Sequence, residues 1–299
     1  MDTSTDTTSV TPFSGDVLNI LSKVPTLPLY HYTTQRGLLG IIKDRQIWAT
    51  HHRHLNDLQE FVYAKRMFCG ELQRRAQTDP SDTFLKRMQG ALEGEGFENV
   101  NLYIASFSED PDSLPQWRGY GGPAAGFSLG FRASEMALPR SFKMVKCVYI
   151  EDEQRTMIEA LVTEILDRLR RIPGVAEGVD LGPYAWGFCQ IGLQTYAPVL
   201  KHPKFKEERE WRIISEVMMD DPPNQKGESP LDFREGRSGL VPYRPVPLRD
   251  STNQFPLAEI VVGPNPDPER SCRAVRSLLT KRGLTNCSVR TSDVPYRNW

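Results

Sequence analysis

The chain has 299 residues and a formal net charge of −1, from 37 basic and 38 acidic residues. This balance excludes a general electrostatic field that would draw the protein to nucleic acid or to an anionic membrane. No apolar run approaches the roughly 18 residues that a membrane-spanning helix needs, and the five scattered cysteines form no C-x-x-C pair. We therefore expect a cytoplasmic protein with reduced thiols and no membrane partner.

The N-terminal residues MDTSTDTTSVTPF lack the basic start and the apolar stretch of a signal peptide. They predict a disordered tail over 1–14. Apolar strand candidates occur towards both ends of the remaining chain, and no flexible linker divides it. Because this length can bury a large core, we predict a single domain over 15–299.

Short apolar runs and helical periodicities alternate through the first third of the chain. They predict strands over 27–33 and 47–50, a helix between them capped by a threonine, a helix capped by Asn56, and a helix over 82–92. Threonine and asparagine are favoured helix caps. In each helix, apolar residues recur at the spacing of one buried face.

The stretch from Asn101 to Phe131 combines the most varied chemistry. An apolar strand over 102–105 precedes a polar run with Ser106 and Ser108, two prolines, then Trp117, Arg118 and Tyr120, and a second strand that ends at Phe131. A rigid strand that leads into a polar, aromatic loop is typical of a binding site. The alternative is a long β-hairpin in which Trp117 and Tyr120 only anchor the core.

The second half of the chain predicts the remaining elements. These are a strand over 142–150, an amphipathic helix that stops at Pro173, a helix over 183–200, a strand over 211–215, a surface excursion over 222–247 and a C-terminal β-α-β unit over about 257–292. This order predicts an α+β fold with a mixed β-sheet core flanked by helices.

Three groups of residues are candidates for chemistry. His31 lies near the end of a strand, where it is either a ligand contact or an ordinary edge histidine. If Glu210 opens a strand, the Glu208-x-Glu210 pair places both carboxylates on one face. The alternative is a solvated run of charges. Arg118 and Arg212 each follow a tryptophan, and we predict for both a structural ion pair, with Asp57, Glu60, Asp110 and Asp112 as the possible partners.

Nucleotide and metal motifs are mostly missing from the sequence. It contains no P-loop, no dinucleotide-binding glycine motif and no G-x-S-x-G. His51, His52 and His54 lie near Asp57 and Glu60, but no helical H-x-x-x-H supports a metal site there. We expect no metal, and a metal-assisted phosphodiesterase built on this cluster stays open as an alternative.

Several ordered motifs resemble a widespread bacterial domain family of unknown function. The resemblance runs from about Leu29 to the C-terminus. The motifs are His31-Tyr32-Thr33, Leu55-Asn56-Asp57 to Glu60, Ser106-Phe107-Ser108 to Trp117-Arg118-x-Tyr120, Glu208-x-Glu210-Trp211-Arg212 and Ile260 to Pro264. This resemblance by itself implies no activity.

The order of motifs is also remotely similar to the ADP-ribosyltransferase fold, which has a split β-sheet. That resemblance implies that NAD is the substrate, that His31 binds its ribose, and that Tyr120, or else Trp117, stacks on nicotinamide. Glu210 would stabilise the ribosyl cation, and Glu208 would position the acceptor. The implied NAD-binding residues are His31, Tyr32, Thr33, Ser106, Ser108, Trp117 and Tyr120.

The implied chemistry needs neither a metal nor a covalent nucleophile. Cleavage of the nicotinamide–ribose bond builds an oxocarbenium-like cation, as glycoside cleavage does, and a fixed carboxylate can stabilise it. The acceptor of ADP-ribose would be an unknown macromolecule, either protein or nucleic acid. The competing interpretation is a non-catalytic module that binds a nucleotide or a peptide in the same cleft.

Overall fold

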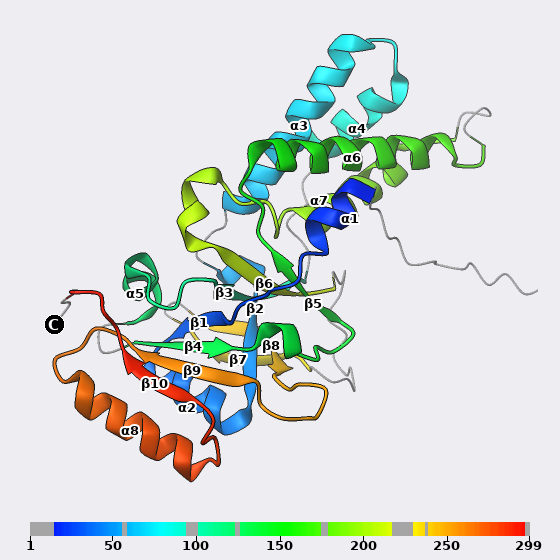
Figure 1. The fold of residues 1–299 in the computed structure, drawn as a ribbon. Coiled ribbons are helices and arrows are strands. Elements are labelled where there is room, and N and C mark those ends of the chain that lie inside the picture. The colour runs from blue at the N-terminus through cyan, green and yellow to red at the C-terminus, as the bar shows by residue number, and fades with distance from the viewer. Residues whose placement is uncertain are drawn as a thin grey trace, which may run out of the picture.

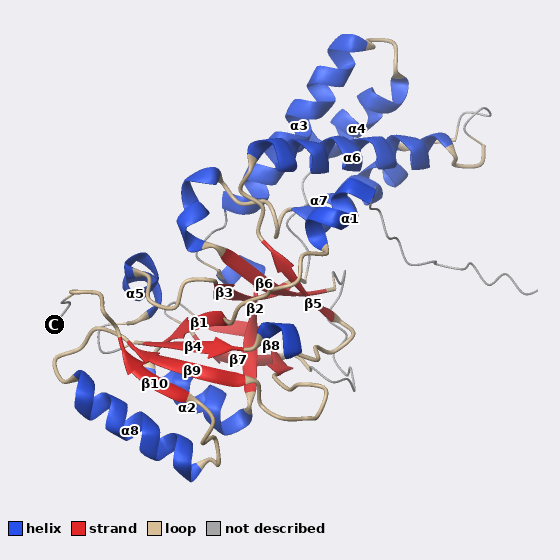
Figure 2. Ribbon diagram, in the orientation of Figure 1, coloured by secondary structure: helices blue, strands red, loops and turns tan. Residues whose placement is uncertain are grey.

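The computed structural model describes residues 15–55, 59–93, 101–122, 126–174, 179–216, 230–236 and 239–296. The predicted tail over 1–14 and the predicted Asn56 cap lie outside these ranges. The described residues form an α+β fold around a mixed, ten-stranded sheet (Figure 2). No helix within them combines the length and the apolar character needed to cross a bilayer.

The elements follow the chain in the order that Figure 1 shows. The first half contains α1 (Gly15–Leu21), β1 (Leu29–Thr33), α2 (Gln35–Asp44), β2 (Gln46–His51), η1 (His52–His54), α3 (Gln59–Thr78), α4 (Thr83–Glu93), β3 (Tyr103–Ser108), α5 (Leu114–Tyr120) and β4 (Phe127–Phe131). The second half contains η2 (Ala133–Glu135), β5 (Phe142–Lys146), α6 (Glu151–Arg170), α7 (Gly182–Tyr196), η3 (Pro203–Glu208), β6 (Glu210–Ser215), β7 (Asp232–Glu235), β8 (Leu240–Pro247), β9 (Leu257–Val262), α8 (Pro268–Lys281) and β10 (Ser288–Thr291).

The sheet divides at β3. Its main path runs β10-β9-β4-β1-β3-β2-β8-β7, while β6 pairs with the other edge of β3 and with β5. Strand β1 pairs with β4 along its whole length but meets β3 only at Tyr30 and Ser108. Strand β2 meets the same edge of β3 at Tyr103 and Ile104. Between these two contacts, residues 105–107 have no neighbouring strand on that edge among the described residues.

Helices pack against the sheet in two groups. In Figure 1, α2 and α8 lie beside the β1-β4-β9-β10 part of the sheet, and their apolar faces share a core with it. The other group, α1, α3, α4, α6 and α7, stands at the opposite end of the molecule and shares a second core with β3, β5 and β6.

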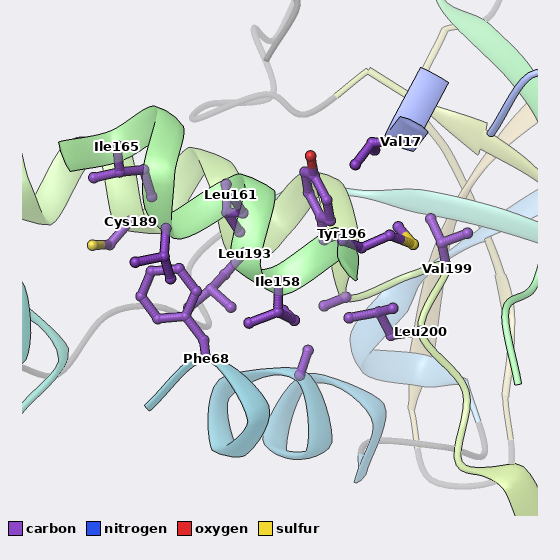
Figure 3. Packing of buried hydrophobic residues seen from close by; sticks show 14 of the residues in the cluster. Val17, Phe68, Ile158, Leu161, Ile165, Cys189, Leu193, Tyr196, Val199 and Leu200 are labelled. Atoms are coloured by element: carbon purple, nitrogen blue, oxygen red, sulfur yellow. The ribbon is translucent and has the colours of Figure 1, made fainter. Parts of the chain in front are cut away.

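The second core depends on the close approach of α6 and α7. Figure 3 shows Ile158, Leu161 and Ile165 of α6 packed beside Leu193 of α7. A β-carbon at Gly192 would lie only 2.6 Å from the Leu161 Cδ1 atom. Gly192 is therefore tolerated within the helix because the absence of a side chain lets the neighbouring helix approach.

The predicted elements differ from the structure in three places. Strand β3 continues through the polar Ser106 and Ser108, because pairing with the distant β6 completes its backbone hydrogen bonds. Trp117 and Tyr120 lie in a helix, α5, and not in a loop. The excursion predicted over 222–247 contains β7 and β8, where pairing with β2 overrides a proline-rich sequence that argues against a strand.

The other elements agree more closely with the sequence. Thr34 caps α2 by accepting a hydrogen bond from the backbone N–H of Gly37, and α7 ends before Pro198. The C-terminal segment forms β9, α8 and β10, with the two strands parallel, as the β-α-β pattern over 257–292 predicted.

Candidate functional site

A cavity of about 510 Å³ opens where β1 and β3 part. This volume falls within the range of small-molecule sites, which is about 300–1,000 Å³. Its walls come from β1, α2, β2, η1, α3, β3, α5, β6 and β7 and from the segment that precedes β6. The predicted site residues that line it are His31, Tyr32, Thr33, Ser106, Ser108, Tyr120, Glu208 and Glu210.

Trp117 does not line the cavity, so the expectation that it does is wrong. Its side chain is 2% exposed, its ring packs edge-on against Tyr32 with centroids 4.7 Å apart, and its Nε1–H donates to Asp112 at 2.7 Å. These contacts make it a core anchor, which was the alternative interpretation. Tyr120, by contrast, is 44% exposed and lies on the cavity wall.

His31 bridges the split in the sheet. Its Nδ1 atom lies 2.9 Å from the backbone oxygen of Ser106, on the edge of β3 that lacks a strand neighbour. A carbonyl oxygen can only accept, so Nδ1 carries the proton, and Nε2 of the neutral ring is an acceptor. Burial lowers the pKa of His31, which favours this neutral form.

Tyr32 organises the chain that follows β3. Its hydroxyl donates to the backbone oxygen of Asp110 at 2.7 Å and accepts from the backbone N–H of Ser113 at 2.8 Å. Burial raises the pKa of Tyr32 well above its ordinary value, so the hydroxyl stays protonated. Both hydrogen bonds position the start of α5.

Ser108 joins β3 to the segment that carries the paired glutamates. Its hydroxyl donates to the backbone oxygen of Glu208 at 2.7 Å and accepts from the backbone N–H of Asp110 at 3.0 Å. Ser106, also on the cavity wall, lies directly opposite Arg212 in the β3–β6 register. The Ser108 hydroxyl therefore fixes the backbone at Glu208, and strand pairing at Ser106 positions Arg212.

Five charged side chains form a cluster on the cavity wall: Glu60, Lys201, Glu208, Glu210 and Arg212. Arg212 makes two hydrogen bonds to Glu60, both at 2.6 Å, and two to Glu210, at 2.8 and 2.9 Å. Lys201 Nζ lies 2.5 Å from both Glu208 and Glu210. The ion pair predicted for Arg212 is thus present, with Glu60 as one of its partners, whereas Arg118 lies over the Tyr296 ring, 5.3 Å from its centroid.

The cluster keeps an excess of negative charge, because it opposes three carboxylates to two cations. Burial alone would raise the pKa of Glu210, but Arg212 and Lys201 outweigh that effect and hold it at about 2. Burial alone would likewise lower the pKa of Lys201, but Glu210, Glu60 and Glu208 raise it well above its usual range. Glu210 and Lys201 therefore stay charged at neutral pH.

The two glutamates of the Glu-x-Glu pair differ in their access to the cavity. The Glu208 side chain is 24% exposed, whereas that of Glu210 is 7% exposed. Glu210 opens β6, where its backbone N–H donates to the Tyr149 hydroxyl at 3.0 Å and its backbone oxygen accepts from Cys147 at 2.9 Å. Glu210 is thus the more rigidly held of the two carboxylates.

Several cavity residues have no recognisable signal in the sequence. Lys201 follows α7 without any motif, and it meets the glutamates only because the chain folds back beside β6. Trp48, Thr50 and Arg234 also line the cavity. The sequence predicts a surface excursion over 222–247, and Arg234 belongs to that segment. Only the pairing of β7 with β8, and of β8 with β2, could place it at the cavity.

The candidate metal ligands His51, His52 and Glu60 each contact another residue of the protein. His51 Nε2 lies 3.2 Å from the Asn101 side-chain oxygen, His52 packs against Phe61, and Glu60 binds Arg212. Asp57 lies outside the described residues. Within the described ranges, no three histidine, cysteine, aspartate or glutamate side chains converge in a way that could hold a metal ion.

Comparison with known proteins finds a family model that matches part of the chain. Residues 116–213 match the model of a family described as "Protein of unknown function (DUF2971)". This match agrees with the resemblance to a domain family of unknown function, and it covers Trp117, Glu208, Glu210 and Arg212. No curated protein and no solved structure matches the chain.

Proposed function

We propose that the protein is an NAD-dependent, ADP-ribosyltransferase-like enzyme. It would cleave the nicotinamide–ribose bond and transfer ADP-ribose to a macromolecular acceptor, either protein or nucleic acid. The observation that carries this proposal is the convergence of His31 and Glu210 on one cavity at the split in the sheet. They come from β1 and β6, which are separated by β3.

The bond that breaks is the one between ribose C1′ and the nicotinamide nitrogen. Its electron pair leaves with nicotinamide, which becomes neutral, and positive charge develops on the ribose as an oxocarbenium-like ion. The cluster around Glu210 holds one excess negative charge in a partly desolvated wall, where it can stabilise that cation. The acceptor nucleophile then bonds to C1′ and loses a proton.

Glu210 would act as the fixed anion of this reaction. Its Oε1 atom accepts one hydrogen bond, from Arg212 Nε, while Oε2 accepts from both Lys201 and Arg212. Each carboxylate oxygen has two lone pairs. Oε1 therefore retains acceptor capacity for a ribose hydroxyl that reaches the wall of the cavity.

Three further residues would complete the site. Nε2 of neutral His31 would accept a hydrogen bond from a ribose hydroxyl, and the exposed Tyr120 ring would stack on nicotinamide. Glu208, the more exposed carboxylate, would take the proton of the acceptor nucleophile. Tyr32 and Ser108 would hold these groups in position without touching the reacting atoms.

A second candidate function is a non-catalytic nucleotide-binding module. The observation that favours it is the double ion pairing of Glu210, since Arg212 and Lys201 hold both of its carboxylate oxygens. A carboxylate bound in this way can serve stability alone. In such a module the cavity would bind NAD without releasing nicotinamide.

Nicotinamide release separates the two functions. The purified full-length chain is incubated with NAD, alone and with candidate protein and nucleic acid acceptors, and nicotinamide and ADP-ribosylated products are measured by mass spectrometry. The transferase predicts nicotinamide that accumulates with time and increases with the correct acceptor. Saturable NAD binding without any nicotinamide release would instead establish the binding module.

A further inference from the structure

At the end of the cavity opposite the glutamate cluster lies an arginine whose hydrogen-bonding groups are not all satisfied by the described residues. Arg234 on β7 lines the cavity, and its Nη2 donates to the Thr50 hydroxyl at 3.3 Å. Its Nε atom is buried and has no hydrogen-bond partner in the part of the chain that the structure describes. A buried, unsatisfied donor on a guanidinium is costly unless a ligand completes it.

Arg234 also differs from the other cations of the cavity in its pairing. Lys201 and Arg212 bind the glutamate cluster, and Arg36 lies 3.5 Å from Glu235 in a pair that is largely exposed. Among the described residues, no carboxylate forms an ion pair with Arg234. Desolvation lowers its pKa, as expected for a partly buried cation without an anionic partner.

The charges of the lining are therefore separated along the cavity. At the β6 side, three carboxylates face two cations, which leaves one negative charge; at the β7 side, Arg36 and Arg234 face Glu235, which leaves one positive charge. The Arg234 guanidinium reaches Thr50 on β2, two strands away from β6 across β3. Two strand spacings correspond to about 10 Å.

An aromatic surface lies beside this positive end. Trp48 and Thr50 belong to the same strand, and side chains two residues apart on a strand project from the same face. Trp48 lines the cavity, is 39% exposed, and stacks on Tyr243 with ring centroids 4.4 Å apart. Tyr243 in turn donates to Asp232 at 2.8 Å. The indole is thus held in place with part of its surface open to a ligand.

We infer that the β2-β8-β7 end of the cavity is a subsite for a nucleoside diphosphate, in which Arg234 binds the phosphoryl oxygens and Trp48 stacks on the base. A guanidinium matches the geometry of phosphoryl oxygens, and an indole is a platform for a flat ring. This inference deepens the proposed function, because the ADP moiety of NAD would occupy this end while its cationic nicotinamide faces the glutamate cluster.

The test is equilibrium binding of ADP, adenosine and inorganic pyrophosphate to the full chain, followed by calorimetry and by quenching of tryptophan fluorescence. We expect Arg234→Gln to weaken ADP binding tenfold or more and to leave adenosine binding within about twofold. Trp48→Ala should weaken both ligands. Pyrophosphate should compete with ADP in the wild type and lose this ability in Arg234→Gln.

Two further variants control for charge and for folding. Arg132→Gln removes one positive charge outside the cavity lining, where Arg132 pairs with Glu135, and it should leave ADP binding unchanged. Arg234→Lys keeps the charge but loses the planar fork, so it should give an intermediate affinity even if the glutamine variant does not fold. A wild type that fails to bind ADP, or an Arg234→Lys variant that binds it with unchanged affinity, would overturn the inference.

Failure of the subsite and failure of the proposed function give different results. ADP binding that depends on Arg234, in a protein that never releases nicotinamide from NAD, would remove the transferase and keep the subsite. Nicotinamide release with the same KM for NAD in wild type and in Arg234→Lys would remove the subsite and keep the transferase.

Discussion

At the scale of single residues, Glu210 is the group whose surroundings most constrain its role. Arg212 and Lys201 overcome the effect of burial and hold its pKa at about 2. The carboxylate is therefore charged throughout the neutral pH range. The same contacts that would keep it anionic for catalysis also connect β6 to α3 through Glu60.

The depressed pKa of Glu210 predicts a specific loss of stability in acid. Its pKa falls from 4.5 to about 2 on folding, so its contribution is complete above pH 4.5 and is lost as the pH falls towards 2. That shift corresponds to roughly 3 kcal/mol. In Glu210→Gln, the free energy of unfolding should change less over this window than in wild type, as urea titrations at several pH values would show.

Glu71→Gln is the matched comparison for this measurement, because the same argument predicts that it too loses part of the acid sensitivity of the wild type. Glu71 is also buried and binds two arginines, Arg74 and Arg75, but it lies on α3 and does not line the cavity. Arg74 and Arg75 likewise lower the pKa of Glu71 against the effect of burial. Equal acid sensitivity of wild type and Glu210→Gln would contradict the assigned ion pairs.

His31 yields a prediction about ligand binding. Because the neutral ring would accept through Nε2, His31→Ala should weaken NAD binding by roughly three- to tenfold, the effect of one neutral hydrogen bond. Binding is measured in the Glu210→Gln background, where turnover is slow. His31→Gln, whose amide oxygen can accept, should recover part of the affinity.

The pH dependence of NAD binding tests the protonation state of His31. Burial lowers the pKa of His31 below its usual 6.5, so the neutral ring predominates at pH 6.5 and increases above it. Affinity should change little from pH 7.5 to 8 and decrease at acidic pH, as Nε2 becomes protonated and can no longer accept. Affinity that increases on acidification through pH 6 would contradict the assignment.

At the scale of elements, the connection from β3 to α5 depends on one hydroxyl. Tyr32 binds the backbone of both Asp110 and Ser113. Tyr32→Phe removes both hydrogen bonds and leaves a buried N–H and C=O without this partner, which should cost about 1–3 kcal/mol of unfolding free energy. Tyr184→Phe, at an exposed position, should have almost no effect in the same denaturation experiment. Equal stability of the two variants would show that the hydroxyl does not organise this connection.

The sequence predicted elements whose signals are local and missed those that depend on distant partners. The helix α2 has a cap and an apolar face, and β9-α8-β10 has apolar runs on either side of an amphipathic helix, so both could be predicted. The strand character of Ser106 and Ser108 depends on pairing with β6. The strand character of β8, LVPYRPVP, depends on pairing with β2.

The residues of the candidate site also divide into those with a local sequence signal and those that depend on distant partners. His31, Glu208 and Glu210 could be singled out because each stands at a recognisable place relative to a strand. Lys201 and Arg234 could not, since neither the segment after α7 nor the short strand β7 has a sequence pattern that indicates the partner of its basic residue. Trp117 was misassigned because a tryptophan beside a polar run has the same sequence appearance whether its ring faces a cavity or a core.

At the scale of the whole molecule, one cluster joins the helical group to the sheet. Glu60 of α3 binds Arg212 of β6, and Lys201, which follows α7, binds Glu208 and Glu210. We therefore predict that the chain unfolds as one cooperative unit. Urea unfolding followed by tryptophan fluorescence and by far-ultraviolet circular dichroism should give coincident transitions. Two separated transitions, or two stable halves after limited proteolysis, would contradict a single domain over 15–299.

The central claim is that a fixed carboxylate at the split in the sheet stabilises the cation formed when NAD loses nicotinamide. The most direct measurement is the rate of nicotinamide release from NAD by wild type, Glu210→Gln and the control Glu71→Gln, each at a temperature where it is folded. We predict that Glu210→Gln lowers kcat by on the order of 10²-fold or more with little change in NAD affinity, and that Glu71→Gln retains the wild-type rate. A Glu210→Gln enzyme that releases nicotinamide at the wild-type rate would contradict the claim.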